Sequence, residues 1–357
     1  MNNCFIRKIV FILCIVFTTA FVLKNTTYTF PNLIFFPRIV NSNTFTNEKI
    51  KLGRYLFYDS TLSYNNTISC ASCHKQQYAF SDSPNAFSVG VNNTKTKRNS
   101  MPLFNLMWSN AMFWDGRVKT VEEQVSHPLF NKNEMNTTWK ELINKMNANK
   151  MYSELFKKAF NSTHIDSSKI VISLSQFVKT LISHQSKYDN VLYHKDKFTK
   201  DEYEGYLLLN NQTRGNCLHC HTTDGDVLGT TFKFSNNGLD AVDDVNNFID
   251  KGRGEITQNK FDNGKFKIPS LRNLLFTAPY MHDGRFRTLE EVINFYSDGL
   301  HKSPTIDNKM EFVQAGGSKF SPREKQYIIA FLRTMSDSIF IKSNNYSNPF
   351  NTKFVKE

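Results

Sequence analysis

The sequence CASCH occupies positions 70–74 of this 357-residue chain, and CLHCH occupies positions 217–221. In each stretch two cysteines are separated by two residues, and a histidine follows the second cysteine directly. The chain contains six cysteines, and the other two, Cys4 and Cys14, lie close to the N-terminus. Every cysteine in the body of the chain therefore belongs to this repeated pattern, and the fold prediction depends on what the pattern binds.

Four kinds of site use paired cysteines. Disulfides form in oxidising compartments, but they do not require a histidine after the second cysteine. A structural zinc site could combine two such pairs, yet these pairs lie far apart in the sequence and each has its own histidine. A thioredoxin-like redox motif is expected near a βαβ pattern, which this sequence lacks. The fourth kind is covalent attachment of c-type haem, which uses both thiols and the adjacent histidine, and we favour it.

The spacing within each motif suits a haem. Two residues between the cysteines allow one helical turn to reach across the porphyrin edge, so that both thiols meet a vinyl group and the histidine projects under the iron. The predicted ligands of the two c-type haems are Cys70, Cys73 and His74 for the first and Cys217, Cys220 and His221 for the second. His74 and His221 are then the proximal iron ligands.

A longer repeat surrounds these motifs. FWDGRVKTVEEQV, at 113–125, matches MHDGRFRTLEEVI, at 281–293, at nearly every position. Each haem motif also follows a predicted helix, NEKIKLGRYLFYD at 47–59 and KDEYEGYLLLNN at 200–211. The sequence therefore indicates two copies of one haem-binding domain.

Two further helices complete the predicted fold. Apolar residues recur at helical spacing over 167–192, which we expect to link the halves, and over 321–335, which we expect to close the second half. The predicted fold class is all-α, with two cytochrome c-like domains that each hold one haem. The expected domains are residues 44–195 and 196–340, followed by a tail at 341–357.

The net charge of the chain indicates the kind of partner it binds, and its N-terminal residues indicate its location. Lys and Arg number 44 against 32 Asp and Glu, a formal net charge of +12, which favours acidic partners. No basic stripe with interleaved aromatic residues is present, so we expect no nucleic-acid partner. Arg7 and Lys8 precede a mostly apolar run at 9–23, the pattern of an export signal. Residues 1–24 are predicted to be a signal peptide or an N-terminal membrane anchor, and the protein to be exported and periplasmic.

The ordered motifs resemble those of the bacterial di-haem cytochrome c peroxidase and MauG family, from about residue 52 to residue 332. In order they are LGRYLFYDSTLS, SCASCH, RNSMPLFN, FWDGR, NEM, CLHCH, PSLRN, TAPYMHDG and TLEEV. The resemblance implies two c-type haems, a calcium ion between the domains and hydrogen peroxide as the oxidant. Peroxide would react at the N-terminal haem, while the C-terminal haem passes on electrons from a small c-type cytochrome or cupredoxin.

The resemblance also implies roles for individual residues. Glu134, in NEM, matches the distal carboxylate that moves a proton between the two oxygens of peroxide. Trp114, in FWDGR, matches the aromatic residue that relays electrons between the haems. Gln124 stands where the family has a second polar residue beside the first haem. The residues at calcium-binding positions are Asn99, Thr277 and Pro279.

Two positions depart from many members of the family. Val91 stands where they carry a histidine that blocks the first iron until the other haem is reduced, and no histidine occurs at 75–122. We therefore expect an open first haem. Tyr296 stands where they carry a methionine ligand of the second iron, the placement of the tyrosine ligand in MauG. A phenolate stabilises ferric iron and lowers the reduction potential. In the alternative, Met281 or Met310 binds this iron.

The favoured function is that of an exported peroxidase that reduces hydrogen peroxide to water at the His74 haem. One alternative keeps the oxidant but oxidises a residue of a partner protein, as in MauG. Another is a di-haem electron carrier without peroxide chemistry. A carrier would have two six-coordinate haems and no need of Glu134, so the sequence disfavours it.

Overall fold

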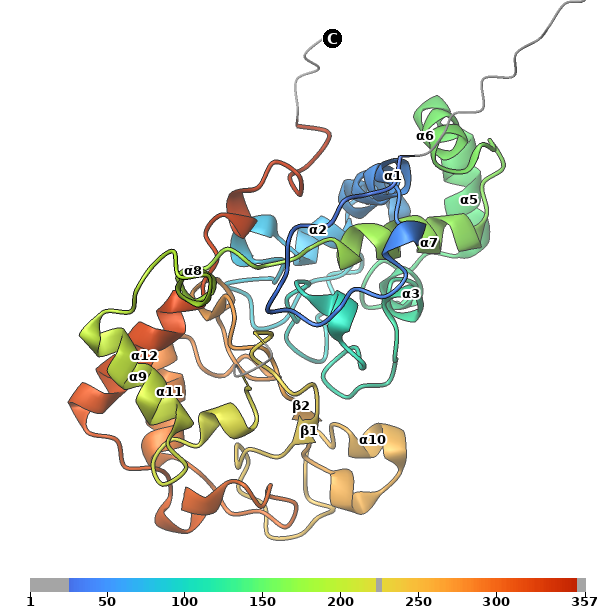
Figure 1. Cartoon of the computed structure of the whole chain (residues 1–357). Helices are drawn as coiled ribbons and strands as arrows, with labels where there is room; N and C mark the ends of the chain where they lie inside the picture. The colour runs from blue at the N-terminus through green and yellow to red at the C-terminus, as the bar shows by residue number, and fades with distance from the viewer. Residues whose placement is uncertain (1–25, 223–226, 352–357) are drawn as a thin grey trace, which may run out of the picture.

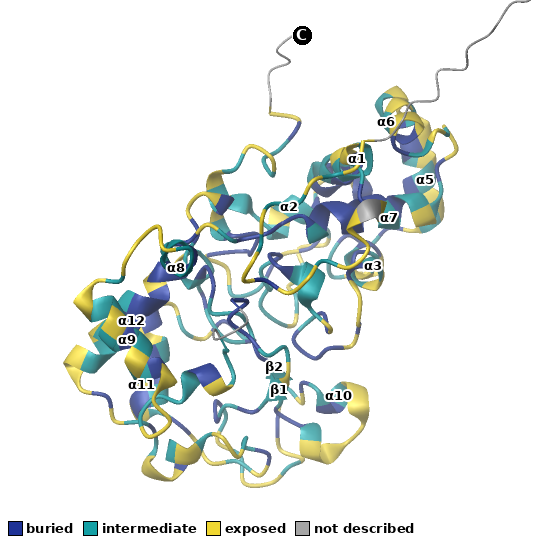
Figure 2. Cartoon of the chain, viewed as in Figure 1, coloured by how far each residue is buried: buried dark blue, intermediate teal, exposed yellow. Residues whose placement is uncertain are grey.

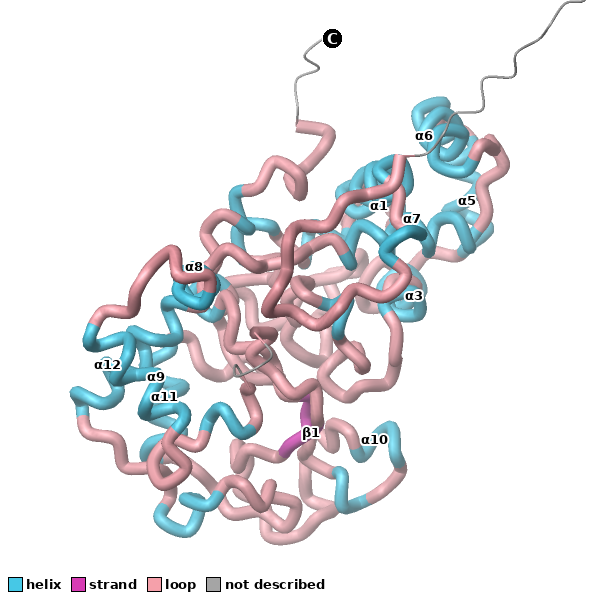
Figure 3. The backbone as a smooth tube through the Cα atoms, viewed as in Figure 1, coloured by secondary structure: helices cyan, strands magenta, loops and turns pink. Residues whose placement is uncertain are grey.

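The computed structural model describes residues 26–222 and 227–351, where long loops join elements that are almost all helices (Figures 1 and 3). This predominance of helix over strand agrees with the fold class that the sequence predicts. The α-helices are α1 (Asn47–Tyr58), α2 (Cys70–Cys73), α3 (Val121–Gln124), α4 (His127–Phe130), α5 (Trp139–Asn147), α6 (Lys150–Phe160), α7 (Ser167–Lys179), α8 (Lys187–Leu192), α9 (Lys200–Asn210), α10 (Gly254–Thr257), α11 (Leu289–Asp298) and α12 (Pro322–Thr334).

The predicted export segment, residues 1–24, lies outside the described residues. Among the residues that are described, no helix combines the length and the apolar character that crossing a membrane requires.

Two large hydrophobic clusters organise the molecule. The first cluster draws its buried residues from 52–181 and includes Phe340, while the second draws them from 188–335 and includes Phe36. The clusters correspond in outline to the two halves of the sequence repeat. The exact boundaries of the predicted domains stay a prediction.

One pair of packed helices contributes many of the buried residues of the first cluster. Helices α1 and α7 pack against each other at Gly53, where a Cβ atom would collide with the main-chain carbonyl of Ser173. Thr46 begins α1 by accepting a hydrogen bond from the backbone N–H of Lys49. Figure 2 shows that α7 is buried along much of its length, as its apolar sequence requires.

A second pair repeats this arrangement. Helices α9 and α12 pack at Gly205, where a Cβ atom would collide with the carbonyl of Tyr327. Both helices begin with a capping box, Thr199 with Glu202 and Ser321 with Glu324. The two halves therefore use the same helix crossing.

The prediction of a single helix at 167–192 is wrong, because the chain forms α7 and α8 with a break between them. After α7, the Ser183 N–H donates to the side-chain oxygen of Asn105, at 2.9 Å. The Asp337 carboxylate accepts from the N–H groups of His184 and Gln185. A capping box of Ser186 with Asp189 then starts α8. These partners from distant segments replace the helical hydrogen bonds of the break.

Both ends of the described chain cross to the other half. Near the start, Phe36 lies in the second cluster, and Trp108 donates its indole N–H to the carbonyl of Pro37. Near the end, Phe340 lies in the first cluster and contacts the rings of Phe80 and Tyr346. Figure 1 shows this red C-terminal segment reaching the first half.

The structure adds one small sheet to the predicted helices. Strands β1 (Phe234–Ser235) and β2 (Phe266–Lys267) pair antiparallel, with Phe234 opposite Lys267. The backbone N–H of Lys267 donates to the carbonyl of Trp114, at 2.7 Å, so the sheet also attaches to the first half. It holds the segment before the PSLRN motif against the domain junction.

Candidate active site

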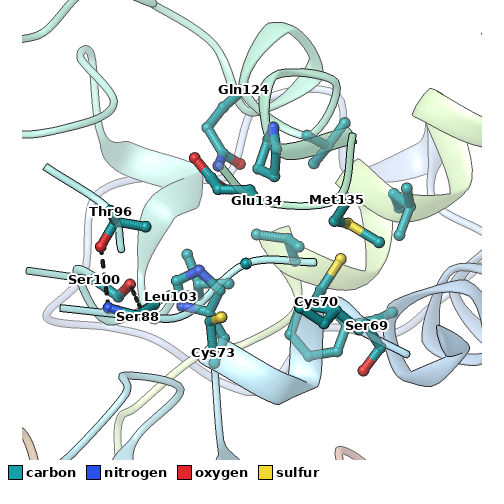
Figure 4. Close-up of a pocket in the computed structure, with 18 of the residues that line it drawn as sticks. Ser69, Cys70, Cys73, Ser88, Thr96, Ser100, Leu103, Gln124, Glu134 and Met135 are labelled. Atoms are coloured by element: carbon teal, nitrogen blue, oxygen red, sulfur yellow. Dashed lines mark hydrogen bonds between the residues drawn. The ribbon is translucent and has the colours of Figure 1, made fainter. Parts of the chain in front are cut away.

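The first cavity lies beside the N-terminal CASCH motif (Figure 4). Cys70 and Cys73 line one side, and Gln124 and Glu134 lie together on the opposite side. The space between these side chains, together with the solvent-open part of the cavity, amounts to about 670 Å³. Apolar side chains make up much of its remaining wall: Phe57, Ile68, Leu103, Val125, Leu174 and Val178.

Both motif histidines are oriented by a backbone carbonyl. Nδ1 of His74 lies 2.8 Å from the carbonyl oxygen of Phe80, and Nδ1 of His221 lies 2.9 Å from that of Pro269. Because a carbonyl only accepts, Nδ1 carries the proton and Nε2 keeps its lone pair. Burial lowers the pKa of His74, and it lowers that of His221 to about 4. Both rings are therefore neutral and suited to bind iron.

The four motif cysteines fit haem attachment. All four are free thiols, and each pair lines the same cavity as its histidine. Burial raises the pKa of Cys70 and of Cys217 to about 12, so neither thiol is an activated thiolate nucleophile. Paired thiols and a neutral imidazole at one apolar cavity are the donor set that a c-type haem requires.

Glu134 is the ionisable group facing the first cavity from the side of Gln124. Its Oε1 accepts a hydrogen bond from Nδ2 of Asn131, at 2.6 Å. Burial raises the pKa of Glu134, although this hydrogen bond and the positive charge of Arg117 act in the opposite direction. A raised pKa means that the carboxyl group binds a proton more readily than a solvated one, which suits it to take up and pass on a proton.

The loop before Asn99 brings no second histidine to this cavity. Val89 and Gly90 line it, rather than Val91, whose N–H donates to the carbonyl of Glu134 at 2.9 Å. Among the described residues that line the cavity, the only histidine is His74. On the side of the cavity where Glu134 lies, no described lining residue could bind iron through an imidazole.

The second cavity contains the CLHCH motif and three candidate ligands. Tyr296, Met281 and Met310 all line it with Cys217 and His221. The Tyr296 hydroxyl oxygen accepts a hydrogen bond from Nδ2 of Asn237, at 3.0 Å. Burial raises the pKa of Tyr296 to about 12, and the Asn237 hydrogen bond opposes this shift. A phenolate at this position therefore needs a cation such as iron beside it, and Tyr296 ligation stays a prediction.

Trp114 borders two cavities, and each of them contains one of the motif histidines. It lines the second cavity together with His221, and it also lines an interdomain cavity to which His74 and Glu134 belong. Its side chain is buried, and its indole N–H donates to the carbonyl of Asn99, at 2.9 Å. The structure thus gives Trp114 the position of a bridge between the cavities.

The three predicted calcium residues, Asn99, Thr277 and Pro279, all line the second cavity. The Asn99 amide nitrogen donates to the carbonyls of Asn85 and Ala86, which leaves its Oδ1 for another partner. No cluster of three or more His, Cys, Asp or Glu residues able to hold a metal occurs in the described ranges. A cation here would use neutral oxygens, which calcium accepts, and this role stays a prediction.

Sequence reasoning missed a buried ion-pair network at the domain junction. Arg98 pairs with Asp115 at 2.5 Å and with Asp250 at 2.6 Å, and Glu255 lies 3.2 Å away. Asp115 follows Trp114 in the chain, while Asp250 and Glu255 come from the other half. Asp-Gly at 115–116 is a local turn signal, but no local feature of the sequence indicates that Asp115 pairs with Arg98.

Comparison with known proteins gives consistent matches. A family model described as di-haem cytochrome c peroxidase matches residues 47–197. The chain is 32% identical to the methylamine utilization protein MauG of Methylorubrum extorquens, over 82% of this chain and 80% of that protein. It is 33% identical to the cytochrome c551 peroxidase of Nitrosomonas europaea, over 81% of this chain and 80% of that protein.

Solved structures agree with these matches. A MauG-like protein associated with microbial copper homeostasis superposes with a TM-score of 0.79 at 32% identity, covering 90% of this chain and 99% of that one. The diheme peroxidase BthA from Burkholderia thailandensis shares the fold, with a TM-score of 0.67 at 21% identity over 84% of this chain and 89% of that one.

Proposed function

The chain belongs to the di-haem cytochrome c peroxidase and MauG family and is a peroxidase oxidoreductase, and from this premise we propose that it reduces hydrogen peroxide to water at the cavity of His74. The observation that carries the proposal is the arrangement of this cavity. It has one histidine among its described lining residues and a polar pair, Glu134 and Gln124, on the side opposite the cysteines. The family implies two haems, and we propose that the motif cysteines attach them covalently.

The protein residues hold the substrate and move its protons. The haem iron, when bound, supplies the electrons that cleave the oxygen–oxygen bond. His74 would hold that iron through Nε2, while the carbonyl of Phe80 fixes the ring. Glu134 would take a proton from the near oxygen of peroxide and return it to the far oxygen, which leaves as water. Gln124 would orient the peroxide by hydrogen bonding, and Asn131 holds the Glu134 carboxyl in place.

Two electrons and two protons are needed for each peroxide, so the cavity must be supplied from a reductant. We propose that electrons enter at the His221 cavity and pass Trp114, which borders both cavities. The donor would be a small c-type cytochrome or cupredoxin, and the net charge of +12 favours an acidic one. This chemistry agrees with the predicted periplasmic location, and a calcium ion at Asn99 would stabilise the junction.

A second candidate function keeps peroxide but replaces the donor with a protein substrate that becomes oxidised. Tyr296 favours this candidate, because a tyrosine in the second cavity matches the ligand of MauG rather than the methionine of many peroxidases. An anionic phenolate would stabilise oxidised iron and retain the oxidising equivalents for longer.

The substitution Glu134→Gln tests the proposed role of the carboxyl group. We expect the rate of reaction with peroxide to fall about 10²- to 10⁴-fold, because the amide cannot shuttle the proton. Stopped-flow spectroscopy on protein with both haems bound measures this rate. Glu154→Gln, at an exposed position of α6, is the control and should react like the wild type. An unchanged rate in Glu134→Gln protein would remove this residue from the mechanism.

One equivalent of peroxide separates the candidate functions. A peroxidase should return rapidly to its resting spectrum only when a reduced cytochrome or cupredoxin is present. A protein-oxidising enzyme should hold a long-lived oxidised state instead. Two low-spin haems that do not respond to peroxide would point to an electron carrier and contradict both.

A further inference from the structure

Lys267 is a buried cation without a carboxylate partner. Its exposed fraction is 5%, and its Nζ donates to the main-chain carbonyl of Ala111, at 2.8 Å. No ion pair joins Lys267 to any acidic side chain in the described part of the protein. A carbonyl oxygen is a neutral acceptor, so the charge of this ammonium group is not compensated by the protein.

Two other buried cations of this protein have carboxylate partners. Arg272, whose side chain is fully buried, forms two hydrogen bonds with the carboxylate of Asp189, at 2.5 and 2.9 Å. Arg98, whose side chain is 8% exposed, pairs with Asp115 and Asp250. Burying a charge is unfavourable unless an opposite charge or several hydrogen bonds compensate it. Unlike these two arginines, Lys267 has no carboxylate partner among the described residues.

The position of Lys267 indicates which anion it meets. The side chain lines the second cavity, which contains His221, and also the interdomain cavity, which contains His74. Strand β2 and the hydrogen bond from its own N–H to Trp114 hold its backbone at the junction. Burial lowers the pKa of Lys267 to about 8, and no neighbouring group opposes this shift. Of the two cavities that Lys267 lines, the second is the one proposed to hold the His221 haem.

We propose that Lys267 pairs with a propionate carboxylate of a bound haem and raises the reduction potential of that haem. The proposal rests on the two haems of the proposed function. A propionate is a carboxylate at the edge of the porphyrin, so it supplies the missing opposite charge. A positive charge nearby disfavours the ferric state relative to the ferrous state, because oxidation adds a positive charge at the iron. Lys267 is thus a positioning and tuning residue between the two redox centres.

Two substitutions separate the charge from the packing of this side chain. Lys267→Gln keeps a hydrogen-bond donor but removes the charge, and Lys267→Met keeps the length but removes both. Lys265→Gln is the matched control, because Lys265 lies two residues away and pairs with Asp262 near the surface, at 3.0 Å. Spectroelectrochemistry of the full di-haem protein measures the midpoint potential of each haem, and thermal unfolding measures stability.

We expect Lys267→Gln to lower the midpoint potential of one haem, which identifies the haem whose propionate is bound, while Lys265→Gln leaves both potentials unchanged. We also expect Lys267→Met to unfold at a lower temperature than the wild type, because a buried propionate would lose its cation. If the lysine were unpaired, removing its charge would raise the unfolding temperature instead.

Unchanged potentials in Lys267→Gln protein that retains both haems would contradict the proposal. Haem content is measured separately, so wild-type protein without covalent haem would contradict the proposed function itself. If neither variant can be purified with haem, a crystal structure of the haem-loaded wild type decides the question. Nζ of Lys267 within hydrogen-bond distance of a propionate oxygen supports the pair, and Nζ far from every propionate oxygen refutes it.

Discussion

At the scale of single residues, the two cavities differ in the polar group that faces them. The first presents a carboxyl group, Glu134, and the second presents a phenol, Tyr296. Burial raises the pKa of both groups, and each accepts a hydrogen bond from an asparagine amide, Asn131 or Asn237. The two cavities thus offer different groups to the proposed chemistry, a carboxyl group for proton transfer and a phenol for iron ligation.

The substitution Tyr296→Met tests the assignment of the second ligand. We expect the midpoint potential of the second haem to rise, because a neutral thioether stabilises ferric iron less than a phenolate does. Spectroelectrochemistry measures the potential, and EPR reports the change in ligand. Tyr280→Phe is the control, since Tyr280 lines the same cavity but donates its hydroxyl to the carbonyl of Leu274. Equal potentials in Tyr296→Met and wild-type protein would show that Tyr296 is not a ligand.

The sequence could predict these facing groups but not the residues that support them. The CxxCH motifs carry their chemistry in contiguous letters, whereas Glu134 and Tyr296 could be assigned only through the family resemblance. Asn237 lies 59 positions from Tyr296 in a segment without helical periodicity, and only the folded chain brings the two together. Lys267 resembled any other lysine of a basic chain, because burial is a property of the fold.

At the scale of elements, each half depends on one close helix crossing. Gly53 in α1 and Gly205 in α9 each face a main-chain carbonyl of the partner helix. An added methyl group has no space there, because the neighbouring atoms are backbone and cannot rotate away. The glycine is therefore retained in spite of its low helix propensity.

We expect Gly53→Ala and Gly205→Ala each to destabilise the protein by about 1–3 kcal/mol or more, as overpacked cores do. Helix propensity alone predicts the opposite sign, a gain of about 1 kcal/mol. Thermal and denaturant unfolding measure the change. Gly299→Ala, where the nearest atom would lie 3.3 Å from the added carbon, should have a smaller effect. A stabilised Gly53→Ala protein would mean that α1 and α7 can separate at low cost.

Helix starts were predictable where a capping box marked them, as Thr199 does for α9 and Ser321 for α12. The break between α7 and α8 was missed, because apolar periodicity continues through it. The capping box of Ser186 with Asp189 was present in the sequence as a local sign of the break. The groups that stabilise it, Asn105 and Asp337, are distant in sequence and could not be assigned in advance.

At the scale of the whole molecule, Arg98 joins the two halves beside Trp114. Its guanidinium group lies between Asp115 of the first half and Asp250 of the second, and it also contacts the ring of Phe266. Burial alone would raise the pKa of Asp250, but hydrogen bonding and the charge of Arg98 lower it below its usual value. The stability that this carboxylate contributes is therefore present at neutral pH and is lost as the pH falls through the lowered pKa.

We expect Arg98→Gln to reduce the free energy of unfolding by about 3–5 kcal/mol, because it leaves the carboxylate of Asp250 without a cation and removes one of the two arginine partners of Asp115. Arg285→Gln removes a more exposed arginine that pairs with Asp240 and Asp283, and it should cost about 0–1 kcal/mol. Thermal unfolding at neutral pH compares the two variants. A loss no larger than that of the control would show that the network does not hold the halves together.

The exchanged ends of the chain have a consequence for how the protein is made. A ribosome releases the chain from its N-terminus, so residues 52–181 emerge long before Phe340. Phe340 is 2% exposed in the completed first cluster, where it packs on Phe80 close to the CASCH motif. Until residue 340 has been synthesised, the first hydrophobic cluster lacks one of its buried side chains. The first half can therefore complete its core only after the C-terminal segment has been synthesised, although almost all of its other residues come from the start of the chain.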